Sequence, residues 1–470
     1  MSSTFFGVEI GKRGLMAAQK ALDVISHNMV NAGTPGYTRQ VANIVATDPF
    51  SYPSANAEIS AGQLGTGVDV ASINRIRDLL LDEQIRKETS TLNYWNSQND
   101  LLDQIERIMN EPSKTGIQST LDAFWKSLQD LQGSKAADPS TRDIVASTAV
   151  TLTDYIKQTY NDLKNLRSTV DKQVQDTVKT INNYATQLAD LNDQIGKVTI
   201  QGDQPNDLLD QRDIVLEKLS ELVNIRVSFD QQNRATVTLG GGTLVSGVEY
   251  NQLTTTPNPA DPTISDITWK GVADPASSKI SVSNGMLKGL LDIRDTALPN
   301  MMADLDTLTS TLITEMNKQH QQGFDLEGKP GGMFFTGTGA ADIGVSADIQ
   351  LNSSKIAASA TGASGDSGNS DKMAGIFQQK LFNGKTATIG EFFAGVVAKL
   401  GVDSASAQSR VKNQNLLVTS LNQKRESVSG VSMNEETANS LIFNHAFDAA
   451  SKVITTMDEL LDVIINRLKV

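Results

Sequence analysis

Apolar residues near the C-terminus recur in alternating steps of four and three. This series comprises Phe443, Phe447, Ala450, Ile454, Met457, Leu461, Ile464 and Leu468. A matching series near the N-terminus comprises Val8, Gly11, Leu15, Ala18, Leu22, Ile25 and Met29. Such steps form the heptad repeat, with which one helix winds along another. We predict that helices at the two chain ends pack against each other and against copies of the chain.

A second apolar stripe runs beside the first in the C-terminal helix. Its members are Ile442, Ala446, Ala449, Val453, Leu460 and Val463. Two adjacent stripes make a face that is wider than one partner helix covers. We therefore predict that this helix contacts at least two neighbours. We also predict that Met1–Asn31 and Asn434–Val470 are disordered in the monomer and become helical on assembly.

The middle of the chain is dominated by helical patterns. The longest predicted helix, Pro139–Ile200, contains one glycine and no further proline, and a heptad series follows its second half. About 60 residues at 1.5 Å each make a rod of roughly 90 Å, which is typical of an elongated subunit. Further helices are expected over Ser3–Asn31, Asp78–Asn110, Ile117–Leu131, Pro205–Val223, Met286–Gln322 with an interruption at Pro299, Asp371–Phe382, Ile389–Ser427, and from Asn434 onward.

Two mid-chain stretches break the helical period. Residues 225–284 alternate between apolar and polar positions, which predicts a small β-rich region. Residues 324–370 are loop-rich, and Ala357–Ser370 is so poor in large side chains that we expect it to be flexible. Near the N-terminus, Gly33–Gly36 should end the first helix before extended segments in Tyr37–Val70.

These elements predict a mainly α fold with a small β-rich region, in which the chain goes out and returns. The predicted domains are a terminal coiled-coil domain (1–77 and 434–470), a helical bundle domain (78–224 and 285–433, with the loop-rich 324–370), and the β-rich region (225–284).

Composition excludes several functional classes. The 470 residues carry a formal charge of −13, which argues against a nucleic-acid-binding surface or attraction to anionic lipid. Cysteine is absent, so disulfides, thiolate metal sites and a cysteine nucleophile are impossible. No apolar run approaches the roughly 18–20 residues of a membrane helix, and Met1–Ser26 does not read as a cleaved secretory signal.

Candidate chemistry is sparse. The three histidines, His27, His320 and His445, have no acidic or histidine partner at ligand spacing, so we interpret them as surface or packing residues. Gly240–Gly242 lies between predicted strands and is read as a turn, not as a phosphate loop. The oxygen-rich Asp366–Asp371 lacks the spacing of a calcium loop. We predict no catalytic, cofactor-binding or metal site, and no small-molecule substrate.

Several blocks resemble a known family. The stretch Ser26-His27-Asn28-Met29-Val30-Asn31-Ala32-Gly33-Thr34-Pro35-Gly36-Tyr37-Thr38-Arg39-Gln40 is similar to the N-terminal signature of bacterial flagellar axial proteins. The end of this stretch resembles the flagellar hook-associated protein 1 (FlgK) family of hook–filament junction proteins. The same family is resembled by four further blocks, at 65–86, 206–213, 317–335 and 427–436. The family-motif positions are Asn28, Asn31, Thr34, Pro35, Gly36, Tyr37, Arg39, Gln40, His320 and Gly323.

The resemblance implies a non-enzymatic structural subunit that forms a ring with copies of itself. It also implies contacts with the hook protein and a second hook-associated junction protein, export by the flagellar type III system, and an extracellular location. Both heptad series, apart from Gly11, are the expected assembly interface. A cytosolic export chaperone is expected to cover Ile442, Phe443, Phe447, Val453, Ile454, Leu460, Leu461, Val463 and Ile464.

Three alternative interpretations stay open at this point. A rod or hook protein would share the Thr-Pro-Gly-Tyr segment, although the long helix Pro139–Ile200 favours the junction protein. An extracellular adhesin would bind a host ligand through the middle of the chain. An enzyme would need catalytic activity in the β-rich region 225–284.

Overall fold

The computed structural model describes residues 5–48, 65–272 and 279–467. Leu468, the predicted helix start at Ser3, and part of the expected extended segment therefore lie outside the described residues. The chain divides into two compact units. The terminal unit comprises Met1–Thr89, Ile181–Gln252 and Asn415–Val470; the mid-chain unit comprises Ser90–Thr180 and Leu253–Gln414. The three-part division expected above stays a prediction.

Helices account for most of the described chain, which confirms the predicted mainly α fold with small β regions. The α-helices are α1 (Phe6–Asn31), α2 (Leu79–Met109), α3 (Ile117–Asp130), α4 (Pro139–Ile200), α5 (Asn206–Leu222), α7 (Met286–Asp292), α8 (Leu298–His320), α9 (Ala347–Leu351), α10 (Gly368–Gly375), α11 (Ile389–Ser429) and α12 (Met433–Asp462). None of the described helices is long and apolar enough to cross a bilayer.

The strands form small antiparallel sheets. They are β1 (Gln40–Ala46), β2 (Val68–Arg75), β3 (Ile225–Phe229), β4 (Ala235–Leu239), β5 (Gly242–Ser246), β6 (Glu249–Tyr250), β7 (Leu253–Pro257), β8 (Ser265–Trp269), β9 (Phe335–Thr336) and β10 (Gly344–Val345). In the terminal unit β1 pairs with β2, and β3 to β6 form a meander in chain order. Gly240 and Gly241 have φ of 57° and 88° between β4 and β5, which confirms that this glycine run is a turn.

The β3–β6 meander is attached to α4 by one buried amide. Asn192 donates to the carbonyl oxygens of Ala235 (2.8 Å) and Gly247 (2.7 Å) and accepts from the Ala235 N–H (2.7 Å). The inward side chains of β4, from Ala235 to Leu239, are fully buried as period-two alternation requires. The heptad positions of α4 from Val170 to Ile195 are likewise mostly buried, as expected for an internal bundle.

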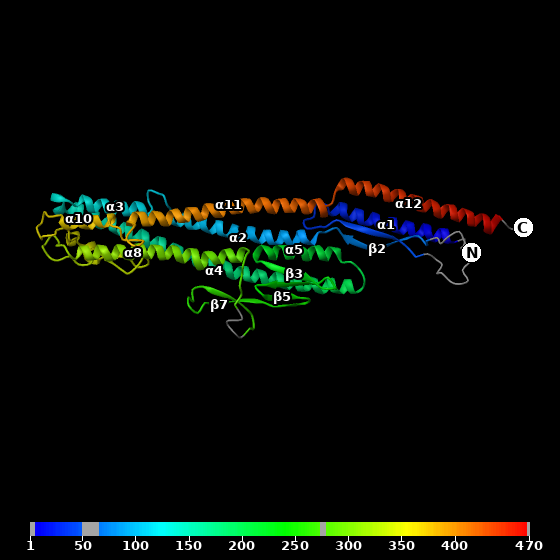
Figure 1. Ribbon diagram of the computed structural model, residues 1–470, viewed down its shortest axis with the longest axis horizontal. Helices are drawn as coiled ribbons and strands as arrows, with labels where there is room; N and C mark the ends of the chain where they lie inside the picture. The colour runs from blue at the N-terminus through cyan, green and yellow to red at the C-terminus, as the bar shows by residue number, and fades with distance from the viewer. Residues whose placement is uncertain (1–4, 49–64, 273–278, 468–470) are drawn as a thin grey trace. The chain divides into compact units, whose positions relative to one another are not determined.

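The two ends of the chain pack against each other within the terminal unit. Helices α1 and α12 lie side by side, with β1 and β2 also in contact with α1 (Figure 1). Gly7 lies against Met457 and Gly14 against Ala450, so the two helices run antiparallel. The predicted pairing of the chain ends is therefore confirmed within one molecule.

Glycines on α1 allow this close approach, and they support a test. A Cβ at Gly11 would lie 2.8 Å from Ile454 Cγ1, whereas one at Gly14 would make an ordinary 3.6 Å contact with Ala450 Cβ. We expect Gly11→Ala to weaken the terminal unit by about 1–3 kcal/mol through overpacking. Gly14→Ala is the matched control and should strengthen it by about 0.5–1 kcal/mol, because glycine disfavours helix. Amide hydrogen exchange in α1 measures both; equal effects would contradict the close-packing account.

The core of the mid-chain unit is built around aromatic side chains. Phe124 of α3 lies 5.7 Å, centroid to centroid, from both Phe334 and Phe335, and these three rings are fully buried. Arg142 of α4 is also buried, and it donates to the carbonyl oxygens of Ala136 (2.7 Å) and Ile356 (2.6 Å). A buried guanidinium thus holds the loop after α9 against the start of α4.

The structure corrects one prediction and refines another. Ala357–Ser370, expected to be flexible, is buried at both ends, and Asp366 accepts hydrogen bonds from Ala360 N (2.7 Å) and Gly368 N (2.9 Å). Small side chains here permit close packing, and the flexible assignment was wrong. The interruption expected at Pro299 is a π-helical turn, Ile293–Ala297, after which proline occupies the first turn of α8, where an N–H is dispensable.

Candidate functional site

The exposed surface of the paired end helices is the first candidate site. The series Phe443, Phe447, Ala450, Ile454, Met457 and Leu461 is half-buried along α12, whereas Ile464 is exposed beyond it. On α1, Gly11, Ala18 and Ile25 are buried, and Val8, Leu15, Leu22 and Met29 are half-buried. The second stripe is largely uncovered in the single chain, although Val453 also approaches Gly11 of α1. Its exposed members are Ile442, Ala446, Ala449, Val453, Leu460 and Val463. Helix α12 therefore uses one stripe within the chain and presents the other outward.

The segment after α1 is fixed by a buried asparagine. Asn28 donates to the Gln40 carbonyl (2.8 Å) and accepts from the Gln40 N–H (2.9 Å) and the Tyr37 hydroxyl (2.8 Å). Burial, followed by the charges of Asp207, Asp210 and Glu436, raises the pKa of Tyr37 far above its ordinary value. The phenol therefore stays protonated and continues to donate to Asn28.

The turn between Asn28 and Gln40 is likewise fixed by hydrogen bonds and by a glycine. Thr34 donates from its N–H to the Asn31 carbonyl (2.9 Å), and Tyr37 N–H donates to the Thr34 carbonyl (3.1 Å). Gly36, after Pro35, has φ of 80°, and a Cβ there would lie 2.5 Å from Ile214 Cγ1 of α5. Only glycine satisfies both the left-handed backbone and the close approach of α5.

Arg39 connects the turn to both sides of the break between α11 and α12. Its N–H donates to the Ser429 carbonyl (2.9 Å) at the end of α11, and its guanidinium pairs with Glu435 Oε2 (2.6 Å) in the first turn of α12. Ser432 caps α12, where its hydroxyl accepts from the Glu435 N–H (3.4 Å). Arg39 thereby fixes the first turn of α12 relative to the end of α11.

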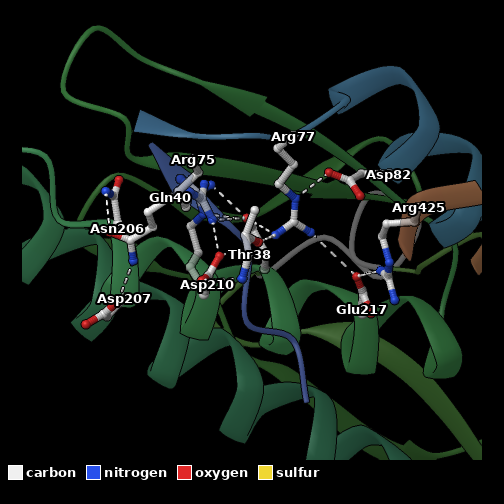
Figure 2. Close-up of polar contacts among 12 residues, drawn as sticks. Thr38, Gln40, Arg75, Arg77, Asp82, Asn206, Asp207, Asp210, Glu217 and Arg425 are labelled. Atoms are coloured by element: carbon white, nitrogen blue, oxygen red, sulfur yellow. Dashed lines mark hydrogen bonds and ion pairs between the residues drawn. The ribbon is translucent and has the colours of Figure 1, made fainter. Parts of the chain in front are cut away.

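A network of ion pairs lies beneath this turn (Figure 2). Arg75, at the end of β2, pairs with Asp210 (2.6 Å) and Asp213 (3.0 Å) of α5. Arg77 pairs with Asp82 (2.5 Å) and Asp213 (3.0 Å). Further along α5, Glu217 pairs with Arg77 and with Arg425 of α11. Figure 2 shows the labelled side chains of β2, α2, α5 and α11 lying close together around Arg77, which follows the end of β2.

The motif residues join the same network. The Thr38 N–H donates to Asp210 Oδ2 (3.0 Å), and the Gln40 amide bonds Asp207 (3.0 Å) and Asn206 (3.0 Å), both at the start of α5 (Figure 2). The N-terminal motif therefore docks onto α5 through polar contacts.

Asp213 is the centre of the network. Asp213 contacts Arg75, Arg77 and Arg212, and the distance from Arg212 Nη2 to Asp213 Oδ1 is 2.8 Å. The side chain of Asp213 is only 5% exposed. Burial raises the pKa of Asp213, but the charges of Arg212, Arg77 and Arg75 outweigh burial and hold the pKa below its ordinary value. Four arginines pair with four acids here, and Arg86 adds a fifth guanidinium that interacts electrostatically with Asp82, Asp213 and Glu217.

The network is organised to hold segments together. The pocket bordered by Tyr37, Arg77 and Arg425 measures about 30 Å³, which is room for about two waters. Among the residues that the structure describes, no group of three or more His, Asp or Glu could hold a metal ion. The geometry therefore supports a structural clamp.

Two of the expected family-motif residues lie in the mid-chain unit. His320 Nδ1 lies 2.8 Å from the Gly332 carbonyl, and Nε2 accepts from the Ala357 N–H (2.8 Å). Burial lowers the pKa of His320, so the ring is neutral and Nδ1 carries the proton. A Cβ at Gly323 would lie 2.2 Å from Asn369 Nδ2. His320 and Gly323 thus organise a loop core, as the interpretation of His320 as a packing residue predicted.

Comparison with known proteins extends this account. The chain is 33% identical to flagellar hook-associated protein 1 of Bacillus subtilis (strain 168) over 507 residues, which cover 100% of this chain and 99% of the relative. The chain belongs to the flagellar hook-associated protein 1 family. It is also 26% identical to the Escherichia coli (strain K12) member over 96% of this chain and 98% of that one. The Salmonella typhimurium member is 32% identical over 69% of this chain and 58% of its own length.

Family models and a solved structure agree with this membership. The model of the flagellar hook-associated protein FlgK helical domain matches residues 102–335. Models of the flagella basal body rod protein and of the flagellar basal body rod FlgEFG protein C-terminal match 9–38 and 422–468. The structure of the flagellar hook junction protein FlgK from Burkholderia pseudomallei aligns with a TM-score of 0.67 at 20% identity, over 74% of this chain and 100% of that one, which supports the fold. The predicted function, a structural protein of the flagellar axis, is confirmed.

Sequence reasoning assigned no role to the ion-pair network of this family member. A signal was present, because Asp210, Asp213 and Glu217 follow helical steps of three and four and place three acids on one face of α5. Arg75 and Arg77 are likewise two residues apart at the end of β2. Their pairing across more than a hundred residues could not be read from either pattern alone.

Proposed function

We propose that this hook-associated protein forms the hook–filament junction as a ring of identical subunits, assembled through the paired end helices. The exposed second stripe of α12 carries the proposal. Ile442 is 61% exposed and Leu460 51% exposed, although the neighbouring stripe of the same helix is occupied by α1. Burying each larger apolar side chain contributes about 1.5–3 kcal/mol, so an outward stripe of this length favours a partner strongly.

The expected neighbours are the hook protein on one side and a second hook-associated junction protein on the other. Family membership supports association with other flagellar components. The ends also match models of rod proteins, which supports packing of the end helices into a shared axial arrangement. The ion-pair network fixes the turn after α1, and in our proposal it sets the position of the end helices for this packing.

Export through the flagellar type III system, without a cleaved signal peptide, would bring the subunit to the extracellular hook tip. We propose that a cytosolic chaperone covers α12 before export. Its expected contacts include the exposed Ile442, Val453, Leu460, Val463 and Ile464. Phe443, Phe447, Ile454 and Leu461 are half-buried against α1 and become accessible to a chaperone only when α12 separates from α1. The subunit acts in this scheme by packing, without catalysis or a cofactor.

Deleting the gene in its source bacterium tests the proposal. We expect complete hooks without filaments, with filament protein released into the medium, because the filament would lose its attachment. Restoring the gene on a plasmid should restore filaments. Normal filaments in the deletion strain would contradict a junction role, and missing hooks would indicate a rod or hook role instead.

A further inference from the structure

A small pocket with a buried carboxylate lies between α1, β1 and α12. Its volume is about 60 Å³. Apolar side chains from all three elements line it, including Ile25, Val41 and Phe443, and its polar lining is Gln40, Glu436 and Asn439. All of these residues belong to the terminal unit.

Glu436 is the unusual member of this lining. The residue as a whole is only 3% exposed, and its carboxylate forms no hydrogen bond or ion pair within the described part of the chain, although its oxygens keep some contact with solvent through the pocket. Its neighbour Glu435 is exposed and pairs with Arg39. The nearby Tyr37 hydroxyl already donates to Asn28. A carboxylate that is largely removed from water and has no partner gains from pairing with a cation, which another molecule can supply.

The pocket favours an ammonium group. A volume of about 60 Å³ accommodates a compact charged head, and lysine carries such a head on a flexible stem. The apolar walls suit the methylene groups of that stem, as is usual for lysine side chains packed on apolar surfaces.

Charge and spacing point to α1 of a second copy as the source. Helix α12 carries six acids and one base, whereas α1 carries three bases and two acids. Lys12, Met16 and Lys20 lie four residues apart on one face of α1, and Met16 is 52% exposed. The lysines are exposed and form no ion pair among the described residues. We call Lys12, Met16 and Lys20 the α1 ridge. Its two positive charges and its apolar middle residue are complementary to α12, where the exposed Ile442 lies one turn from the pocket residue Asn439.

We propose that the pocket receives the ammonium group of Lys12 or Lys20 from an adjacent copy of this chain. The proposal rests on the assembly of copies through their end helices proposed above. Each copy would present its α1 ridge to the α12 face of the next, which is a heterologous contact that closes into a ring when its rotation permits. The α12 stripe and the Glu436 pocket would then be covered by the same neighbour.

The first experiment compares Glu436→Gln with Glu459→Gln, an exposed acid on the same helix. Both variants are expressed as full chains in the source bacterium, and the amount at isolated hook tips is quantified. We expect Glu436→Gln to reduce incorporation at least tenfold and Glu459→Gln to leave it unchanged. In the purified monomer, Glu436→Gln should raise the thermal midpoint, because an unpaired buried charge is removed. A lowered midpoint, or equal incorporation of both variants, would overturn the proposal.

A second experiment identifies the lysine. The chain contains no cysteine, so Asn439→Cys combined with Lys12→Cys or with Lys20→Cys forms disulfides only through the introduced residues. We expect one of the two combinations to give disulfide-linked dimers of the chain at hook tips. Dimers from neither, or a link from residue 439 to a different protein, would overturn the lysine assignment. Absence of the wild-type chain from hook tips would overturn the proposed function and this inference together.

Discussion

Replacing Asp213 by alanine is expected to lower the free energy of unfolding of the terminal unit by about 3–5 kcal/mol, because one change leaves three buried arginines without their shared carboxylate. Arg75, Arg77 and Arg212 all lie within 3.0 Å of Asp213 and would repel one another once it is gone. Amide hydrogen exchange in α5 and β2 along a urea series measures the loss.

The matched control is Asp193→Ala. Asp193 is a half-buried residue of α4 whose side chain is 45% exposed and pairs with Lys197 four positions later, and such surface pairs contribute about 0.3–0.5 kcal/mol. Both substitutions remove one aspartate from a helix of the same unit, so burial is the variable that separates them. Comparable losses from the two would contradict the clamp described above.

Acid provides an independent measurement of the same carboxylate. The pKa of Asp213 is lower in the folded chain than in the unfolded chain. Its stabilising contribution is therefore complete above the unfolded pKa of about 3.9 and is lost as pH falls through the folded pKa. The difference in stability between wild type and Asp213→Ala should accordingly shrink below about pH 4.

Helices that are determined by the residue pattern within their own segment were predictable from the sequence. The bounds of α4, Pro139–Ile200, follow from proline at the first turn and an uninterrupted heptad series. The pairing of α1 with α12 followed from two matching series, since a long apolar seam has few other solutions. Such patterns show directly which face of a helix is apolar and will be buried, without knowledge of the partner.

Contacts between distant polar residues were not predictable in the same way. Arg75 and Asp210 are 135 positions apart, and their pairing requires the whole path of the chain through the two units. The error at Ala357–Ser370 has a related cause. Small residues indicate flexibility when seen alone, but here Asn369 and Ala357 are buried against Gly323, which needs the absence of side-chain bulk.

Val453→Asp is expected to leave the chain folded and to abolish filament attachment. Val453 is 41% exposed in the single chain, so a charge there should cost less than about 0.5 kcal/mol before assembly. In the proposed ring the same position is covered by a neighbouring subunit, and a buried unpaired carboxylate is costly. Filaments per cell by electron microscopy should fall at least tenfold, while the circular dichroism of the purified chain should not change.

Thr455→Asp is the control, because it introduces the same carboxylate two residues away. At about 100° per residue, position 455 lies on the opposite side of α12 from the stripe. Asp448, Glu459 and Asp462 are already on that polar side, and Thr455 is exposed there. Loss of filaments with both variants would mean that charge on α12 interferes with export or chaperone binding as a whole. Loss with Val453→Asp alone means that the outward apolar stripe is the surface on which the junction is built.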